Sequence, residues 1–340
     1  MKLSSVKLAL KRIALAVAAT LVAVVVVELA LRRLAPRYYP VIVGSYEYDP
    51  ELAFRLRPAS HLFKTTDHQQ ESVTNKLGTA NFQESFDGYQ SLVFAVGDSF
   101  TQGTGLPADM AYPAQLDLML NRDEQGFYAK RVGVVNLGVA GFGGEQALLS
   151  LRRWSDALGP PAVILYMGCD NDFIEDLAFK SGDRHGLELP GSPVWGRAAT
   201  PMRVLQEHTQ IGLRVRNYLL ERKLVRLSDA ALGRAGRRVP VAELQRPLLE
   251  RLAAYARERG ALLVVSWSDP TDSYGWLKAW ADGNGVAFAD WAPKADSVRS
   301  AMPALPLDNQ HSGGHHRGWT NRLIAEEFLR RMKARGFETR

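Results

Sequence analysis

Ser99 is the first residue whose type and position could do chemistry. It lies in the stretch AVGDSFTQG (95–103), directly after the apolar run LVFAV (92–96). A serine hydroxyl is a weak nucleophile by itself, and it needs a base to accept its proton and donors to stabilise the oxyanion that develops. Gly, Asp and Ser are also common in a simple strand-to-helix turn. Ser99 can therefore act as a catalytic nucleophile only if a base and amide donors lie near it.

Two further positions that follow apolar runs could supply such donors. Gly138 lies in VVNLGVAGFG (134–143), where the lack of a side chain would let the backbone amide approach a substrate. Asn171 lies in YMGCDNDF (166–173), and its side-chain amide is a natural oxyanion donor. The alternatives are an ordinary loop glycine and, for Asn171 or Asp172, a helix cap.

The base is expected in the segment LDNQHSGGHHRGWTNRLIAEEF (307–328), just before the last predicted helix. A histidine can accept the serine proton while an aspartate orients its ring, and the segment contains Asp308, His311, His315 and His316. Histidines this close could instead bind a metal. Their spacing matches neither the H-E-x-x-H arrangement nor a cysteine-assisted zinc site. We therefore predict no metal and no cofactor.

The elements that must position these residues follow from short, continuous apolar runs separated by helical stretches. The runs at 92–96, 132–137, 162–167, 261–267 and 286–291 predict strands buried on both faces, which is typical of a parallel sheet between helices. Helices are predicted over 111–121, 246–260 and 321–336. Ligands bind at the carboxyl edge of such sheets. The fold class is therefore α/β, with a doubly wound parallel sheet.

Together, these motifs resemble the SGNH (GDSL) hydrolase family over roughly residues 90–330. GDSFTQG is similar to the nucleophile block of that family, NLG at 136–138 to its glycine block, Asn171 with Asp172 to its asparagine block, and Asp308 with His311 to its D-x-x-H block. The resemblance implies a flavodoxin-like three-layer α/β/α fold with about five strands. It also implies serine esterase chemistry, with Ser99 as nucleophile and the amides of Ser99 and Gly138 plus the Asn171 side chain as oxyanion hole.

The sequence departs from the family pattern at two blocks. One extra residue separates Gly168 from Asn171, which shifts the loop that carries the asparagine. His311 keeps the family spacing to Asp308, whereas His315 keeps the family spacing to the last helix. We favour His315 slightly, since helix register is harder to shift than a glycine-rich loop, and both remain candidates for the base.

Residues 1–35 predict a single membrane anchor. The uncharged stretch 13–27 is extended to Leu31 with Glu28 as its one charge, and it is close to the length that crosses about 30 Å of hydrocarbon. Its larger basic flank is N-terminal, which favours a cytoplasmic N-terminus and a catalytic domain on the extracytoplasmic (periplasmic or extracellular) side. A cleaved signal peptide is the alternative. Glu28 is expected to pair with Arg32.

Downstream of the anchor, residues 36–90 are expected to form a stalk and an extended cap, and 91–336 a hydrolase domain with an insertion at 174–240. The stretch YEYDPELAFRLRP (46–58) resembles the region that follows the membrane helix in anchored members of the same family. Within the insertion, a strongly basic helical stretch is expected after about residue 201.

Composition narrows the function classes. The net charge of +6 arises from 42 basic and 36 acidic residues, and several of the basic residues flank the apolar segment. The sequence contains no run of basic residues interleaved with aromatic residues, which is the pattern that would indicate nucleic-acid binding. The only cysteine, Cys169, is predicted to be a buried core residue.

The main hypothesis is a membrane-anchored serine esterase that acts on a small-molecule or polysaccharide-linked ester. An O-acyltransferase or deacetylase acting on cell-envelope polysaccharide is one alternative. A pseudoenzyme that binds a glycan or protein partner is the other. The sequence does not determine the oligomeric state.

Overall fold

The computed structural model describes residues 3–35, 42, 44–65, 69–122, 126–180, 208–215, 218, 219, 222, 226, 239–309 and 314–337. The chain divides into two compact units. One comprises Met1–Tyr39 with Ala199–Arg226, and the other comprises Pro40–Ala198 with Leu227–Arg340. The predicted divisions at residues 35 and 90 remain a proposal.

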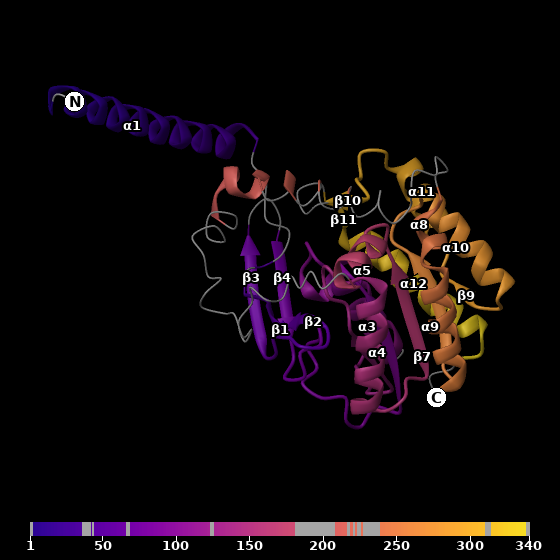
Figure 1. Cartoon of the computed structure of the whole chain (residues 1–340). Coiled ribbons are helices and arrows are strands. Elements are labelled where there is room, and N and C mark those ends of the chain that lie inside the picture. Colours follow the sequence, from indigo (N-terminus) through magenta and orange to yellow (C-terminus); the bar gives the residue numbers. More distant parts are fainter. Residues whose placement is uncertain are drawn as a thin grey trace. The chain divides into compact units, whose positions relative to one another are not determined.

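The first unit contains one long helix, α1 (Leu3–Leu34), drawn in indigo in Figure 1. Its part Val6–Leu34 is long and apolar enough to cross a membrane, although a signal sequence near an N-terminus has the same properties. Glu28 pairs with Arg32 at 2.7 Å, as the sequence predicts. Glu28 also accepts hydrogen bonds from the backbone N–H groups of Gln210 and Ile211, which belong to the basic segment of the predicted insertion.

The second unit is built on a five-stranded parallel sheet with the strand order β6-β5-β7-β8-β9. The strands are β5 (Ser91–Gly97), β6 (Val132–Asn136), β7 (Val163–Gly168), β8 (Leu262–Trp267) and β9 (Ala287–Phe288). In chain order this is the 2-1-3-4-5 arrangement of flavodoxin-like folds, whose ligand crevice lies where the order reverses, between the first and third strands. The reversal falls between β5 and β7 here, so the residues that follow these two strands share one crevice.

Helices cover both faces of the sheet, as expected for a three-layer α/β/α fold (Figure 1). The helix α3 (Tyr112–Asn121) contacts α12 (Gly318–Ala334), which is also in contact with α11 (Ala292–Ala301). These three helices form one group. A second group of helices in mutual contact consists of α4 (Gly144–Leu158), α5 (Asp172–Lys180), α8 (Val241–Leu244), α9 (Arg246–Glu258) and α10 (Asp272–Gly283). All the residues of β6 and β7 are buried, which explains their continuous apolar sequences.

Two antiparallel hairpins precede the sheet and lie outside it (Figure 1). The first joins β1 (Tyr46–Asp49) to β2 (Ala53–Leu56), and the second joins β3 (Ser60–Thr65) to β4 (Gln69–Thr74). Apolar side chains of the first hairpin form a separate small core with Val139 and Phe142. The rings of Phe54 and Phe142 meet edge to face, with centroids 5.3 Å apart. The first hairpin therefore packs on the loop that follows β6.

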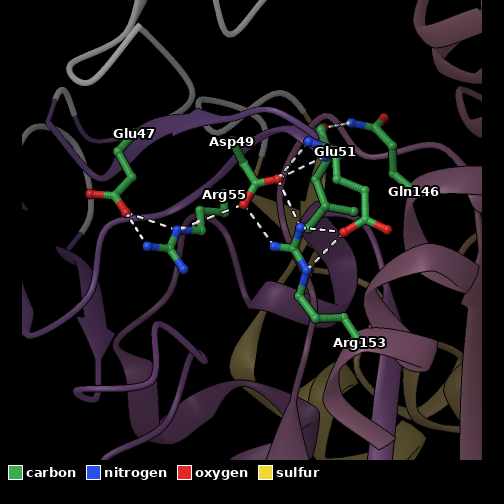
Figure 2. Close-up of polar contacts among 7 residues, drawn as sticks. Glu47, Asp49, Glu51, Arg55, Gln146 and Arg153 are labelled. Carbon is green, nitrogen blue, oxygen red and sulfur yellow. Dashed lines mark hydrogen bonds and ion pairs between the residues drawn. The ribbon is translucent and has the colours of Figure 1, made fainter. Parts of the chain in front are cut away.

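An ion-pair network fastens the same hairpin to α4 (Figure 2). Arg153 of α4 holds both carboxylate oxygens of Asp49 at 2.7 and 2.9 Å, and it also pairs with Glu51. The Asp49 carboxylate in turn accepts hydrogen bonds from the backbone N–H groups of Glu51 and Leu52, which shapes the hairpin turn. Burial by itself would raise the pKa of Asp49, but Arg153 and the turn N–H groups outweigh burial and lower that pKa.

Replacing Arg153 with Met is expected to reduce the free energy of unfolding by about 2 kcal/mol, because the largely buried Asp49 carboxylate loses a bidentate partner. The measurement is urea unfolding of the full-length protein in a non-ionic detergent, followed by tryptophan fluorescence. A carboxylate with a lowered folded pKa contributes stability above its unfolded pKa of about 3.9 and loses it as the pH falls through the folded value. The difference between wild type and Arg153→Met should therefore be full at neutral pH and shrink below about pH 4.

Arg152→Met serves as the control, since the Arg152 guanidinium lies over the ring of Tyr255, 5.8 Å from its centroid. It should change stability much less than Arg153→Met. Equal losses in the two variants, or a difference that does not depend on pH, would contradict the role given to the Asp49 pair.

Candidate active site

Ser99 stands at the carboxyl end of β5, in the first turn of the short helix α2 (Ser99–Gln102). Asp98 caps this helix, and its side chain accepts a hydrogen bond from the Phe100 N–H at 2.9 Å. The Ser99 hydroxyl donates to the other carboxylate oxygen of Asp98 at 3.2 Å. Ser99 is 7 % exposed, and Asp98 is fully buried. The cap therefore fixes the orientation of the Ser99 turn.

Asp98 also connects this turn to two other candidate residues. The Asn171 side chain is hydrogen-bonded to Asp98, and the charge of His315 acts on the same carboxyl group. Burial raises the pKa of Asp98, while the Phe100 N–H, His315 and the Ser99 and Asn171 side chains act to lower it. Two of the residues predicted to accompany Ser99 thus lie around one buried carboxyl group.

Gly138 lies in the loop after β6, pressed against the backbone of the nucleophile turn. A Cβ at Gly138 would stand 2.2 Å from the Gln102 nitrogen and 2.6 Å from the Thr101 carbonyl carbon, so no residue with a side chain fits without moving backbone. Its amide N–H donates to the Asn136 side chain at 3.0 Å. The structure places Gly138 beside the Ser99 turn, with its amide held by Asn136.

Gln102 ties the two loops together. Its side-chain oxygen accepts hydrogen bonds from the Ala140 N–H at 2.7 Å and from the Tyr46 hydroxyl at 3.2 Å. A residue three positions after Ser99 is thereby bonded both to the loop of Gly138 and to the first hairpin. The role of Gln102 cannot be predicted from the sequence, because a polar residue at a helix end carries no signal of long-range contacts.

The extra residue before Asn171 is accommodated in a tight turn between β7 and α5. Asp172 accepts a hydrogen bond from the Cys169 N–H at 3.1 Å, and Asp170 accepts one from the Trp267 indole N–H at 3.0 Å. The Asn171 carbonyl accepts bonds from the first turn of α5, while its side chain is bonded to Asp98. Asn171 thus stands directly before α5 with its side chain bonded to Asp98. Cys169 is buried, as predicted, and burial raises the pKa of its thiol.

Asp308 pairs with His316, which is not one of the two predicted bases. Asp308 and His316 are direct cross-strand partners in the small pair β10 (Asp308–Asn309) and β11 (His315–His316), whereas His315 is opposite Asn309. Cross-strand partners share a face of the ribbon, which brings the Asp308 carboxylate to His316. The distance from His316 Nδ1 to Asp308 Oδ1 is 2.6 Å.

The other ring nitrogen of His316 is also engaged. Nε2 lies 2.6 Å from the Ser268 carbonyl oxygen, and the residue is only 2 % exposed. Both ring nitrogens of His316 are thus within hydrogen-bond distance of an oxygen atom. His316 is therefore committed to Asp308 and to the Ser268 backbone.

His315 is less buried than His316, and the rings of both histidines lie against Phe100. Its ring centroid is 5.0 Å from that of Phe100, the residue after Ser99, and its charge acts on Asp98. His311, the other candidate base, lies outside the described residues. Of the two predicted bases, His315 is the one that the described structure places beside the Ser99 turn.

Asp269, Asp308 and His316 are grouped closely enough to hold a metal ion, with one ligand atom from each within 4.8 Å of the others. In this geometry, however, the two ring nitrogens of His316 point to Asp308 and to the Ser268 carbonyl. A metal ion at this position would have to compete with the Asp308 carboxylate and the Ser268 carbonyl for the His316 ring nitrogens.

No family model matches the chain, and no curated protein matches it. Among solved structures, it is similar to a lipolytic protein of the G-D-S-L family from Veillonella parvula (TM-score 0.40, 14 % identity), with 70 % of this chain and 96 % of that one covered. It is also similar to TesA (TM-score 0.42, 15 % identity, 72 % and 98 % covered). A mutant acetylxylan esterase from Geobacillus stearothermophilus is a third match (TM-score 0.41, 15 % identity, 75 % and 98 % covered). These matches fall in the family that the motifs resemble, and at TM-scores below 0.5 they carry no functional argument.

Gly138→Ala is expected to destabilise the protein by about 3 kcal/mol, because the new methyl group meets backbone atoms that cannot rotate away. Urea unfolding measures this loss. The control is Gly275→Ala in α10, where a Cβ meets no atom within 4 Å. That change should stabilise the protein by up to about 1 kcal/mol, because alanine favours a helix over glycine. A Gly138→Ala protein as stable as wild type would contradict the close approach of the two loops.

Proposed function

We propose that the protein is a serine esterase, with Ser99 as the nucleophile and His315 as the general base. The observation that carries the proposal is the convergence on Asp98 of the Ser99 hydroxyl, the Asn171 side chain and the charge of His315. This convergence lies where the strand order reverses, which is where open parallel sheets bind their ligands.

In the proposed reaction, the Ser99 oxygen attacks the ester carbonyl carbon while His315 accepts the hydroxyl proton. The Asn171 side chain and the amides of Ser99 and Gly138 stabilise the oxyanion. Collapse of the tetrahedral intermediate breaks the bond to the alcohol oxygen, which receives the proton from His315. Water, deprotonated by the same imidazole, then releases the acid from the acyl-enzyme.

Forming this oxyanion hole requires small rearrangements at two donors. The Gly138 N–H must leave the Asn136 side chain, and the Asn171 side chain must share its N–H groups between Asp98 and the substrate. Catalytic hydrogen bonds often reach their final geometry only with substrate bound. Asp308 and His316 flank His315 in the chain and are bonded to each other, and we assign this pair a positioning role for the segment that carries the base.

The N-terminal helix is proposed to anchor this esterase in a membrane, with the catalytic unit on the extracytoplasmic side. Support comes from the length of the apolar helix and from the larger basic cluster before it. The proposed substrate is a small-molecule ester or an ester on a polysaccharide, since both present the same carbonyl group to Ser99.

A fluorophosphonate probe is expected to label the full-length wild-type protein in detergent and to leave Ser99→Ala unlabelled, because only an activated serine hydroxyl reacts with it. Labelling is read by intact-protein mass spectrometry. Ser297→Ala, which removes an exposed hydroxyl on α11, is the control and should be labelled like wild type. If the probe does not label folded wild-type protein, the proposed function is wrong.

Replacing His315 with Ala should lower kcat for a short-chain aryl ester by about 10²–10⁴-fold, because that is the usual contribution of a general base. The acid limb of the wild-type pH profile, where the imidazole becomes protonated, should disappear in this variant.

The other two histidine variants separate the alternatives. His316→Ala should act chiefly on stability, because it leaves the Asp308 carboxylate without its partner. His311→Ala should have little effect on kcat. A larger kcat loss in either of these than in His315→Ala would reassign the base.

A further inference from the structure

The basic segment of the first unit is fixed to the end of the apolar helix rather than projecting freely from it. The Arg32 guanidinium donates to the His208 carbonyl at 2.8 Å, and Glu28 accepts the Gln210 and Ile211 N–H groups at 2.9 and 3.0 Å. The Arg214 side chain donates to the Ala35 carbonyl. Residues within 208–214 are thus bonded to Glu28 and Arg32 of α1 and to Ala35, the residue after it.

Those positions correspond to a definite depth in a bilayer. The apolar part Val6–Leu34 has 29 residues, which corresponds to roughly 43 Å of helix, against a hydrocarbon core of about 30 Å. The ends of the helix must therefore reach the headgroup region. Positions 28–35 extend over roughly 10 Å at one of these ends, which places residues 208–214 among the headgroups when the helix spans the bilayer.

The helical residues that follow present a mixed apolar and cationic face. Val215, Tyr218 and Leu219 are 48 %, 53 % and 57 % exposed, and Arg222 and Arg226 are also exposed. These five residues are each helical, and positions three, four, seven and eleven residues after Val215 fall on one side of a 3.6-residue helical repeat. The Arg222 guanidinium lies over the Tyr218 ring, 5.2 Å from its centroid.

The charge of the segment favours an anionic partner. Residues 210–226 contain five basic side chains (Arg214, Arg216, Arg222, Lys223 and Arg226) and one acidic side chain, Glu221. Tyrosine and arginine beside aliphatic residues are typical of helices that lie in a membrane interface, where rings sit at the headgroups and cations meet anionic lipids.

We propose that the exposed face formed by Val215, Tyr218, Leu219, Arg222 and Arg226 lies in the headgroup region and binds anionic lipid of the leaflet next to the end of α1. The proposal rests on the anchoring role given to α1 and is independent of the esterase chemistry. The segment would hold the C-terminal end of the anchor at the surface by a second, lipid-dependent contact.

The test uses the full-length protein in nanodiscs of phosphatidylcholine, with or without phosphatidylglycerol. In a Cys169→Ala background, a bimane dye is attached at Tyr218→Cys or, separately, at Leu21→Cys in the middle of α1. Quenching is measured with lipids that carry a nitroxide on the headgroup or deep in the acyl chain, and with aqueous iodide. We expect the dye at 218 to be quenched by the headgroup nitroxide, and the dye at 21 by the deep one.

Charge variants test the anionic preference. A basic side chain near an anionic surface shifts the binding equilibrium by about fivefold, so Arg222→Glu with Arg226→Glu should reduce headgroup quenching at 218 several-fold in phosphatidylglycerol discs. The control is Arg257→Glu with Arg299→Glu, which makes the same charge change at exposed residues of α9 and α11 and should leave the quenching unchanged.

The outcomes separate the two proposals. Quenching at 21 but not at 218, or iodide quenching at 218 equal to that of a water-exposed dye, would overturn the lipid contact and leave the anchor in place. Absence of nitroxide quenching at both positions would overturn the anchor and the lipid contact together. Headgroup quenching at 218 that is the same with and without phosphatidylglycerol would refute the anionic preference.

Discussion

The candidate site depends on a single buried carboxyl group. Asp98 is placed at the end of the first sheet strand, where it caps the turn of Ser99, accepts the hydroxyl of Ser99 and is bonded to the Asn171 side chain from the neighbouring strand end. A fully buried acid is costly unless its oxygens have partners. The Ser99 hydroxyl and the Asn171 side chain reduce this cost, and they are also groups that the proposed reaction needs close together. The stability of the fold around Asp98 and the geometry of the site are therefore coupled.

A second layer of contacts holds the loops that surround Asp98. The first hairpin packs Phe54 on Phe142 beyond the Gly138 loop, and the Asp49–Arg153 pair fastens that hairpin to the helix that follows the loop. Gln102 completes the connection by bonding the nucleophile turn to Ala140 and Tyr46. The segment before the sheet, expected as an extended cap, is thus a structural support for the loop whose amide is a proposed oxyanion donor. A loop that relied on its own few contacts would be mobile, and such a donor has to be held in place to be useful.

Much of the fold followed from the pattern of apolar residues. Short, continuous apolar runs separated by helical stretches predicted five parallel strands, and the structure confirms them with the flavodoxin-like order, although β9 is confined to two residues of the predicted 286–291. The helices at 111–121, 246–260 and 321–336 are present within a few residues of their predicted ends. The hairpins were not foreseen, because strands of four to six residues with mixed polarity leave no clear pattern. Hydrogen bonds between Glu28 and residues 210 and 211 were equally invisible, since they join positions more than 180 apart in the chain.

What the sequence by itself determined is which residues stand at strand ends, because burial on both faces of a parallel sheet imposes a continuous apolar run that stops where the chain leaves the sheet. That rule placed Ser99, Gly138 and Asn171 after strand ends on one edge of the sheet, and the resemblance to the SGNH family singled them out from other residues at such positions. Only the tertiary structure decided which histidine receives the Asp308 carboxylate. The choice between adjacent imidazoles depends on the register of two residue pairs across a short ribbon, with Asp308 opposite His316 and Asn309 opposite His315. In that register the His316 ring packs edge to face on Phe100 and Trp291, and residue spacing along the chain carries no record of such long-range contacts.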